Sequence, residues 1–260
     1  MCGIVAVTGY KKALPLLING LEKLEYRGYD SAGIAVINSE TKNITCNKTE
    51  GKLKNLINNL SHKNIPGTVG IGHTRWATHG KPEVKNAHPH TDSSGSIAVV
   101  QNGIIENFQD LKNKLEKEGI IFNSDTDTEV IPHLIQKELN TLSKLNLENN
   151  GSTLLVAVRN VLSDLEGSYA LAVLWSGAPT SLVVSRRQTP LIIGLGEGEF
   201  ICASDTPAIA NFTNIILPLE NEDIALLTPL GIEIYDSNNC LLYTSPSPRD
   251  LSTSRMPSSA

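Results

Sequence analysis

The stretch MCGIVAV (residues 1–7) opens the chain, and its apolar run is typical of a buried strand. Its second residue, Cys2, is small enough to permit removal of Met1, which would leave a thiol and a free α-amine on one residue. An α-amine has a pKa near ~8, so a fraction of it is neutral at cellular pH and can act as a base. An N-terminal nucleophile activated by its own amine is an established catalytic arrangement. On this stretch alone, a reactive Cys2 and a cysteine that only packs in the core are about equally supported.

The composition of the whole chain is that of a soluble globular protein. It has 260 residues, of which 40% are hydrophobic and 19% charged, enough for one large domain or two small ones. The net charge of −5 argues against a nucleic-acid partner. No apolar run reaches the roughly 18 residues of a membrane helix, and the N-terminus lacks the basic lead of a signal peptide. We therefore expect a cytoplasmic protein with no membrane partner.

The four cysteines are far apart and form no CxxC pair, which favours reduced thiols over a disulfide framework or a zinc site. They are Cys2, Cys46, Cys202 and Cys240.

Helix-like and strand-like segments follow one another along the chain. Apolar residues at helical spacing predict helices at residues 11–26, 51–60, 107–119, 126–139 and 152–167. Short apolar runs predict strands at residues 2–7, 32–37, 42–47, 68–76, 96–103, 169–175, 181–186, 190–195, 199–204, 214–219 and 223–229. Pro132 lies inside the fourth of these helices and predicts a bend or a late start there. Because the order is not the strict alternation of a parallel sheet, it favours a layered α+β fold.

The end of the chain has a different composition. From Thr244 it reads TSPSPRDLSTSRMPSSA, with six serines and three prolines among 17 residues. So few apolar side chains cannot offset the entropy of ordering the segment, and we expect it to be disordered. It is also typical of the translated cloning remnants that end truncated reading frames, so we leave it out of the fold prediction.

Several polar motifs stand between the predicted strands and helices. They are EYRGYDSAG (25–33), HTRWATHG (73–80), NAHPH (86–90), NGIIEN (102–107), TDTEVI (126–131) and PLIIGLGEGEFICASD (190–205). The sequences of these motifs and their order resemble those of class II glutamine amidotransferases, which are Ntn hydrolases. More narrowly, they are similar to the glutaminase domain of glutamine–fructose-6-phosphate aminotransferases, also called glucosamine-6-phosphate synthases. Purine-synthesis amidotransferases share the N-terminal cysteine but read HRGQDSAG where this chain has YRGYDSAG.

The resemblance sets domain boundaries and implies a fold. It covers residues 2–236, which we expect to be a glutaminase domain, followed by a disordered, non-native-looking tail at 237–260. No part of the chain resembles the sugar isomerase domains of the family, which bind fructose 6-phosphate. The implied fold is a four-layer αββα sandwich, in which two stacked antiparallel sheets are covered by helices. The strand at residues 2–7 would lie centrally and deliver the Cys2 thiol to a cleft at the strand end.

The implied activity is hydrolysis of L-glutamine to glutamate and ammonia, without a cofactor or metal. In the complete enzymes of the family, the ammonia passes to fructose 6-phosphate and yields glucosamine 6-phosphate. The complete enzyme would be a homo-oligomer, while this fragment could be a monomer.

The resemblance assigns the catalytic residues. Cys2 matches the nucleophile, which attacks the substrate Cδ and gives a γ-glutamyl thioester. The side-chain amide of Asn102 and the backbone N–H of Gly103 match the oxyanion hole, where losing one donor costs on the order of 3 kcal/mol of barrier. Glycine suits this position because no side chain blocks the approach to the amide. Gln101 stands where the family often has histidine, and we do not expect this to change the mechanism.

The resemblance also assigns substrate-binding residues. Arg75 can hold the α-carboxylate of glutamine bidentately, and Asp127 can pair with its α-ammonium. The residues that match the loop closing over the substrate are Trp76, Thr78 and His79. Arg27 matches a turn at the mouth of the active site.

Other interpretations of these residues stay open from the sequence. Asp127 could only stabilise the first turn of a helix, and Asn102-Gly103 could be an ordinary turn pair. His88 and His90 could place two imidazoles on one strand face as metal ligands, although Pro89 separates them. The chain could also be a non-catalytic binding module. Retention of Met1 would favour that reading, because it would convert the α-amine of Cys2 into an amide without a basic lone pair.

Overall fold

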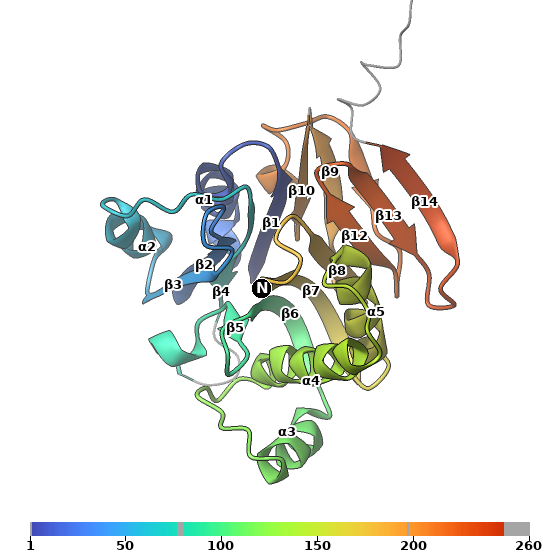
Figure 1. The fold of residues 1–260 in the computed structure, drawn as a ribbon. Coiled ribbons are helices and arrows are strands. Elements are labelled where there is room, and N and C mark those ends of the chain that lie inside the picture. The colour runs from blue at the N-terminus through green and yellow to red at the C-terminus, as the bar shows by residue number, and fades with distance from the viewer. Residues whose placement is uncertain (1, 77–80, 197, 247–260) are drawn as a thin grey trace, which may run out of the picture.

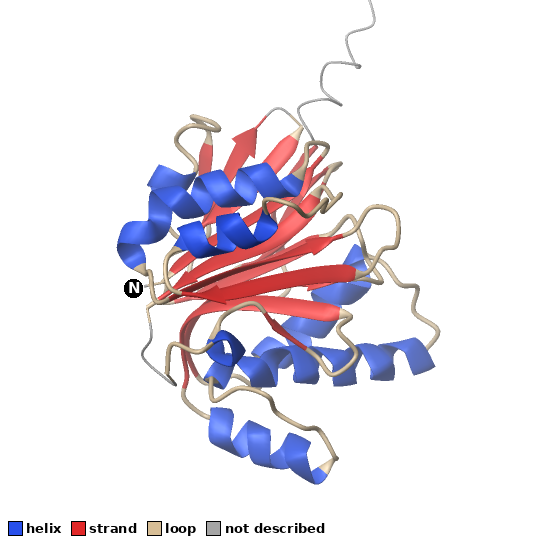
Figure 2. Cartoon of the chain, turned by 90° about the vertical axis from the view of Figure 1, so that its left-hand side faces the viewer, coloured by secondary structure: helices blue, strands red, loops and turns tan. Residues whose placement is uncertain are grey.

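The structure, a computed structural model, describes residues 2–76, 81–196 and 198–246 of the 260-residue chain. Within this part, two seven-stranded sheets are stacked between helices, and neighbouring strands of each sheet pair antiparallel (Figures 1 and 2). The first sheet has the order β11 (Ile216–Pro218), β9 (Ile192–Gly196), β10 (Glu199–Ala203), β1 (Gly3–Gly9), β4 (Val69–Arg75), β2 (Ser31–Ile37), β3 (Ile44–Glu50). The second has the order β14 (Leu241–Pro246), β13 (Gly231–Tyr235), β12 (Ile224–Thr228), β8 (Leu182–Arg187), β7 (Gly167–Trp175), β6 (Ile97–Ile105), β5 (His90–Thr91).

Helices cover the outer face of each sheet. The first sheet packs against α1 (Ala13–Leu24) and α2 (Leu53–Leu60). The second packs against α3 (Phe108–Lys117), α4 (Val130–Lys144) and α5 (Gly151–Leu162). Short 3₁₀ turns lie at η1 (Glu25–Arg27), η2 (Val84–Asn86), η3 (Asp127–Glu129) and η4 (Thr206–Ala208). The predicted four-layer αββα sandwich is therefore confirmed.

The first strand, β1, lies at the centre of its sheet, as predicted. It is the fourth of seven strands, between β10 and β4. Ile4 and Ala6 pack between the two sheets, whereas Val5 and Val7 pack under α1 and α2. A strand covered on both faces needs apolar side chains at every position, which is why β1 reads as a continuous apolar run.

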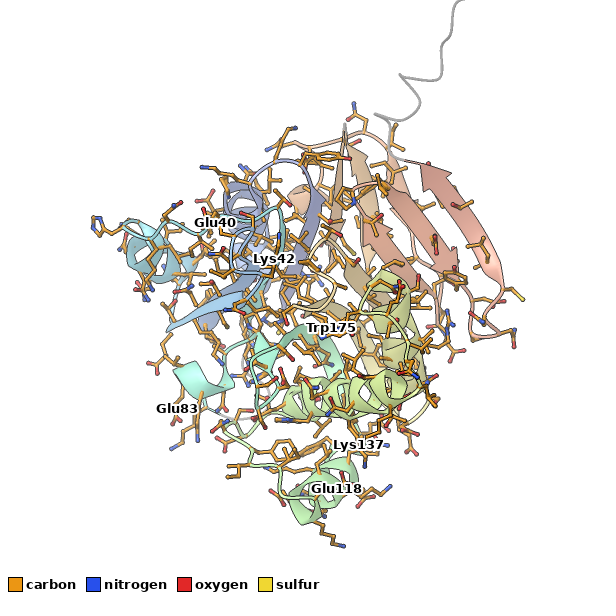
Figure 3. All side chains as sticks on the ribbon, in the orientation of Figure 1. Glu40, Lys42, Glu83, Glu118, Lys137 and Trp175 are labelled. Atoms are coloured by element: carbon orange, nitrogen blue, oxygen red, sulfur yellow. The ribbon has the colours of Figure 1, made fainter. Side chains whose placement is uncertain are left out.

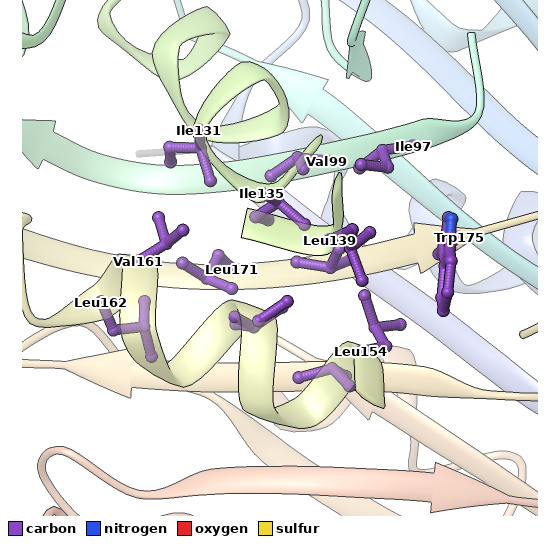
Figure 4. Close-up of a cluster of buried hydrophobic side chains, with 14 of the residues drawn as sticks. Ile97, Val99, Ile131, Ile135, Leu139, Leu154, Val161, Leu162, Leu171 and Trp175 are labelled. Carbon is purple, nitrogen blue, oxygen red and sulfur yellow. The ribbon is translucent and has the colours of Figure 1, made fainter. Parts of the chain in front are cut away.

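Three buried clusters separate the four layers. The cluster between α3–α5 and the second sheet is shown in Figure 4, where Ile135 and Leu139 of α4 face Val99 and Leu171 of the sheet. The other two lie between the sheets and between the first sheet and α1–α2. Each fully buried aliphatic side chain of this kind contributes roughly 1.5–3 kcal/mol of transfer free energy.

The predicted late start of the fourth helix is also confirmed. The 3₁₀ turn η3 precedes α4, which begins at Val130, so that Pro132 falls in the first helical turn. Backbone N–H groups of the first turn have no partner inside the helix, so a proline there removes no hydrogen bond. Figure 3 shows Lys137 of α4 beside Glu118, which follows α3, and an ion pair joins the two side chains.

The predicted end of the ordered domain is wrong. Disorder was expected over 237–260, but Leu241–Pro246 form β14, which pairs with β13 from Gly231 to Tyr235. Tyr243 packs against the core between the sheets. The composition argument failed because an edge strand gains its backbone hydrogen bonds from its neighbour, whatever its side chains are. The rest of the expected tail, 247–260, lies outside the described residues.

Among the helices of the described residues, none is long and apolar enough to cross a membrane.

Candidate active site

Three predicted site residues, Cys2, Arg75 and Asn102, are directed to one end of the space between the sheets, because side chains alternate along a strand. The core in that space includes Ile4, Ala6, Val69, Ile71, Ala98 and Val100. Continuing the alternation directs Cys2, Arg75 and Asn102 to the same side of their strands. In the β1–β4 pairing Gly3 lies opposite Thr74, so the continued register places Cys2 opposite Arg75.

Cys2 is held through both its thiol and its carbonyl group. The backbone N–H of Trp76 donates to Cys2 Sγ at 3.2 Å. The Cys2 carbonyl oxygen accepts from Arg27 Nε at 3.1 Å and from Asn102 Nδ2 at 3.0 Å. Three separate segments of the chain thus fix the position of the sulfur.

Burial raises the pKa of the Cys2 thiol above its ordinary value. The N–H of Trp76 and the positive charges of Arg75 and Arg27 act in the opposite direction. This upward shift of the pKa favours the protonated thiol over the thiolate in the resting state. A nucleophile in this state needs a base to take its proton.

Arg27 holds the backbone of Cys2 in place through the hydrogen bond to its carbonyl oxygen. It is 8% exposed, and its Nη1 forms an ion pair of 2.6 Å with Asp205, which also accepts from Tyr26 at 2.6 Å. The turn that carries Arg27 approaches β4 so closely that a Cβ on Gly28 would lie 2.6 Å from the backbone carbon of Arg75. Glycine at this position is therefore required by the contact between the two motifs.

Asn102 and Gly103 are consecutive residues of β6, and they lie next to Cys2. Asn102 is 5% exposed, and its Oδ1 lies 2.9 Å from His73 Nε2. Gly103 has φ +106°, and a Cβ there would lie 2.1 Å from the carbonyl oxygen of Ser168, so only glycine fits. The backbone N–H of Gln101 donates to His88 Nδ1 at 3.3 Å and therefore points away from β7. Amides two residues apart share a strand edge, which directs the Gly103 N–H to that edge as well.

A cavity of about 340 Å³ opens beside Cys2. Its lining residues are Cys2, Arg27, Trp76, Asn102, Gly103, Ile104, Gln188, Thr189 and Pro190. Five of the nine predicted site residues therefore lie around one cavity. Its volume is in the range of small-molecule sites.

Arg75 and Asp127 are not among the residues that line this cavity. Asp127 Oδ2 accepts the backbone N–H of Ile105 at 2.7 Å, two residues beyond Gly103. Burial lowers the pKa of Arg75, and the negative charges that Cys2, Asp127 and Asp30 carry when they are ionised oppose the shift. Arg75 and Asp127 are thus electrostatic neighbours at the edge of the site. Asp127 is also the first residue of η3, which agrees with the alternative interpretation that it stabilises the start of a helix.

Two predicted site residues, Thr78 and His79, lie outside the described residues. Trp76, which precedes them, is 43% exposed and packs edge-to-face on Tyr29 with ring centroids 5.5 Å apart.

The geometry gives little support to the alternative interpretation of His88 and His90 as metal ligands. Among the described residues, no group of three or more histidine, cysteine or carboxylate side chains is arranged to hold a metal. The two rings lie edge-to-face at 4.7 Å, and His88 also stacks on His73 at 4.2 Å. His90 Nε2 is 2.9 Å from Thr126 Oγ1.

Sequence reasoning missed four contributors to the site. Gln188, Thr189 and Pro190 form one wall of the cavity from the β8–β9 connection, and Asp205 anchors Arg27 from beyond β10. The available signals were the motif at 190–205, which contains Pro190 and Asp205 without giving them a role, and the polar interruption RRQTP (186–190) between two apolar runs. It marks a loop but does not say which cavity the loop reaches.

Comparison with known proteins gives consistent results. A family model described as "Glutamine amidotransferase domain" matches residues 73–211. The glutamine–fructose-6-phosphate aminotransferase [isomerizing] of Thermosynechococcus vestitus is 52% identical over 246 residues, covering 95% of this chain and 38% of that protein. The enzyme of the same description from Nostoc sp. is 54% identical over 236 residues, covering 91% of this chain and 37% of that protein. The chain thus spans less than two fifths of the length of these curated relatives.

Among solved structures, the glutamine phosphoribosylpyrophosphate amidotransferase from B. subtilis matches with a TM-score of 0.75 and 28% identity. The match covers 92% of this chain and 50% of that one.

Proposed function

This chain belongs to the glutamine amidotransferase domain family, and from this premise we propose that it hydrolyses L-glutamine to glutamate and ammonia with Cys2 as the nucleophile. The observation that carries the proposal is the placement of Cys2 Sγ at a cavity whose wall includes Asn102 and Gly103. A thiol beside two amide donors is the arrangement that acyl transfer from an amide requires.

The first half-reaction forms a thioester. The α-amine of Cys2, once Met1 is removed, takes the thiol proton, and Sγ forms a bond to Cδ of glutamine. The electron pair of the amide C=O moves onto oxygen, which accepts from the second N–H of Asn102 Nδ2 and from the Gly103 N–H. The C–N bond then breaks, the α-ammonium returns its proton to the leaving nitrogen, and ammonia departs. A γ-glutamyl thioester remains on Cys2.

The second half-reaction releases glutamate. Water gives a proton to the α-amine and attacks the thioester carbon, which again places negative charge on the oxygen between Asn102 and Gly103. The C–S bond breaks, and the sulfur recovers a proton from the α-ammonium. The two steps together consume one glutamine and one water and yield one glutamate and one ammonia.

Recognition of the amino-acid end of glutamine is assigned to Arg75 and Asp127. Arg75 would bind the α-carboxylate, and the second oxygen of Asp127 would bind the α-ammonium. We assign Trp76, Thr78 and His79 to the segment that covers the substrate, and Arg27 to support of Cys2. In a longer protein like the relatives, the ammonia would pass to fructose 6-phosphate in a cytoplasmic homo-oligomer.

The test of this function is substrate specificity. Glutamine should be hydrolysed with a kcat/KM roughly 10²–10⁴-fold higher than that of propionamide. Propionamide lacks the two charged ends of glutamine, so it loses the contacts with Arg75 and Asp127, which are worth about 1.5–3 kcal/mol each. Asparagine should not be turned over, because it is one methylene too short to reach Sγ. Ammonia release is measured for each amide, after mass spectrometry has established that Cys2 is the first residue. Equal turnover of glutamine and propionamide would contradict the assignment of Arg75 and Asp127.

Fructose 6-phosphate should not affect this 260-residue chain. A ligand changes catalysis only if it binds two states of the protein differently, and no part of the chain resembles the sugar-binding domains. We expect equal amounts of ammonia and glutamate with and without the sugar phosphate, and no glucosamine 6-phosphate. Both products are quantified by enzymatic assay at saturating glutamine. A faster reaction with the sugar phosphate would reveal a binding site that the proposal does not contain.

A further inference from the structure

His73 contacts the proposed oxyanion amide from the side opposite Cys2. It lies on β4, is 1% exposed, and faces the space between the sheets. Its Nε2 is 2.9 Å from Asn102 Oδ1, while Asn102 Nδ2 is 3.0 Å from the Cys2 carbonyl oxygen. The Asn102 amide is thus clamped between His73 and Cys2.

The two partners fix the direction of this amide. The Cys2 carbonyl oxygen can only accept a hydrogen bond, so the NH₂ end of Asn102 must face it. The oxygen end of Asn102 must then face His73, and it can only accept. His73 Nε2 must therefore carry a hydrogen, because a bare nitrogen opposite that oxygen would leave two lone pairs in contact.

The surroundings of His73 favour a neutral ring. Burial lowers the pKa of His73 to about 4, and the positive charge of Arg75 acts in the same direction, while the hydrogen bond of His73 with Asn102 and a weaker one with the backbone of Gln101 oppose the shift. His73 also stacks on His88 at 4.2 Å, and His88 Nδ1 accepts from the backbone N–H of Gln101. A neutral imidazole has one N–H, and the hydrogen-bond pattern above requires that it be on Nε2.

We propose that His73 is a positioning residue, whose Nε2–H holds the oxygen of Asn102 so that its NH₂ group faces Cys2 and the reacting carbonyl. The catalytic consequence rests on the proposed glutaminase function. Without this donor the amide could turn over. Its oxygen would then face the developing oxyanion, and repulsion would replace a hydrogen bond that is worth most in the transition state.

The first measurement needs no activity. In the full chain labelled with ¹⁵N, neutral His73 should show a protonated-type signal at Nε2 and a lone-pair-type signal at Nδ1. A ring with its hydrogen on Nδ1 would overturn the proposal, whether or not the protein hydrolyses glutamine.

The second measurement compares three variants. His73→Phe keeps a ring that can stack on His88 but has no donor, and its kcat should fall about 30-fold. His73→Gln restores an N–H near the position of Nε2, and its kcat should return to within about fivefold of the parent. His90→Phe is the matched control, because His90 also packs on His88, though edge-to-face, and is 3% exposed but bonds Thr126 instead of Asn102. Its kcat should stay within about threefold of the parent.

Two readouts separate positioning from general damage. Alkylation of Cys2 by iodoacetamide forms no oxyanion, so its rate should stay within about threefold of the parent in His73→Phe. The Kd for glutamate should also stay within about threefold. A kcat for His73→Phe within threefold of the parent, parallel losses of kcat and alkylation, or an equal loss in His90→Phe would each overturn the proposal. If the unmodified chain releases no ammonia, the glutaminase function fails, while the ¹⁵N result still decides the His73 tautomer.

Discussion

Replacing Cys2 with alanine should abolish glutamine hydrolysis while the fold survives. We expect kcat to fall by about 10⁴-fold or more, because no other group can form the covalent intermediate. Cys2 precedes β1 and is only partly buried, so loss of one sulfur should hardly change the free energy of unfolding. Ammonia release gives the activity, and circular dichroism during thermal unfolding gives the stability.

The other cysteines provide the controls. Cys46 is exposed on β3, and Cys202 is fully buried on β10, where burial raises the pKa of its thiol. Neither lines the cavity beside Cys2. Cys46→Ala and Cys202→Ala should therefore keep kcat within about threefold of the parent, although Cys202→Ala should cost some stability through a small cavity. Equal losses of kcat in all three variants would refute the assignment of Cys2 as the nucleophile.

Replacing Asn102 with alanine should lower kcat about 10²-fold or more and change KM much less. The Nδ2 group would donate to an oxygen whose charge develops only in the transition state, so its loss acts on the rate and little on binding. Initial rates over a range of glutamine concentrations separate the two parameters.

Gln101 offers a matched control for this variant. It is the neighbour of Asn102 on β6, is equally buried, and bonds Thr128 Oγ1 at 2.7 Å instead of Cys2. Gln101→Ala should keep kcat within a few-fold of the parent. A change confined to KM in Asn102→Ala would mean that Asn102 binds the ground state of the substrate.

Most of the fold could be predicted because its signals are local. The apolar run after Cys2 marked a strand buried on both faces, and Pro132 marked the first turn of a helix. The edge strand β14 could not be predicted, since Leu241–Pro246 owe their conformation to pairing with β13 and only Tyr243 packs into the core. An apolar pattern reports burial of side chains, whereas an edge strand depends on a neighbouring backbone.

By itself, the sequence determined the chemical types at the site and the order of the motifs that carry them. Cys2, the Asn102-Gly103 pair and Arg75 each stand at the end of an apolar run, where a buried strand leaves the core. Only the tertiary structure decided which of these groups meet. The sheet register places Cys2 opposite Arg75, and the stacking of the two sheets brings Asn102 between Cys2 and His73. Such contacts join residues up to 100 positions apart, and no local pattern can encode them because they depend on how the whole sandwich packs.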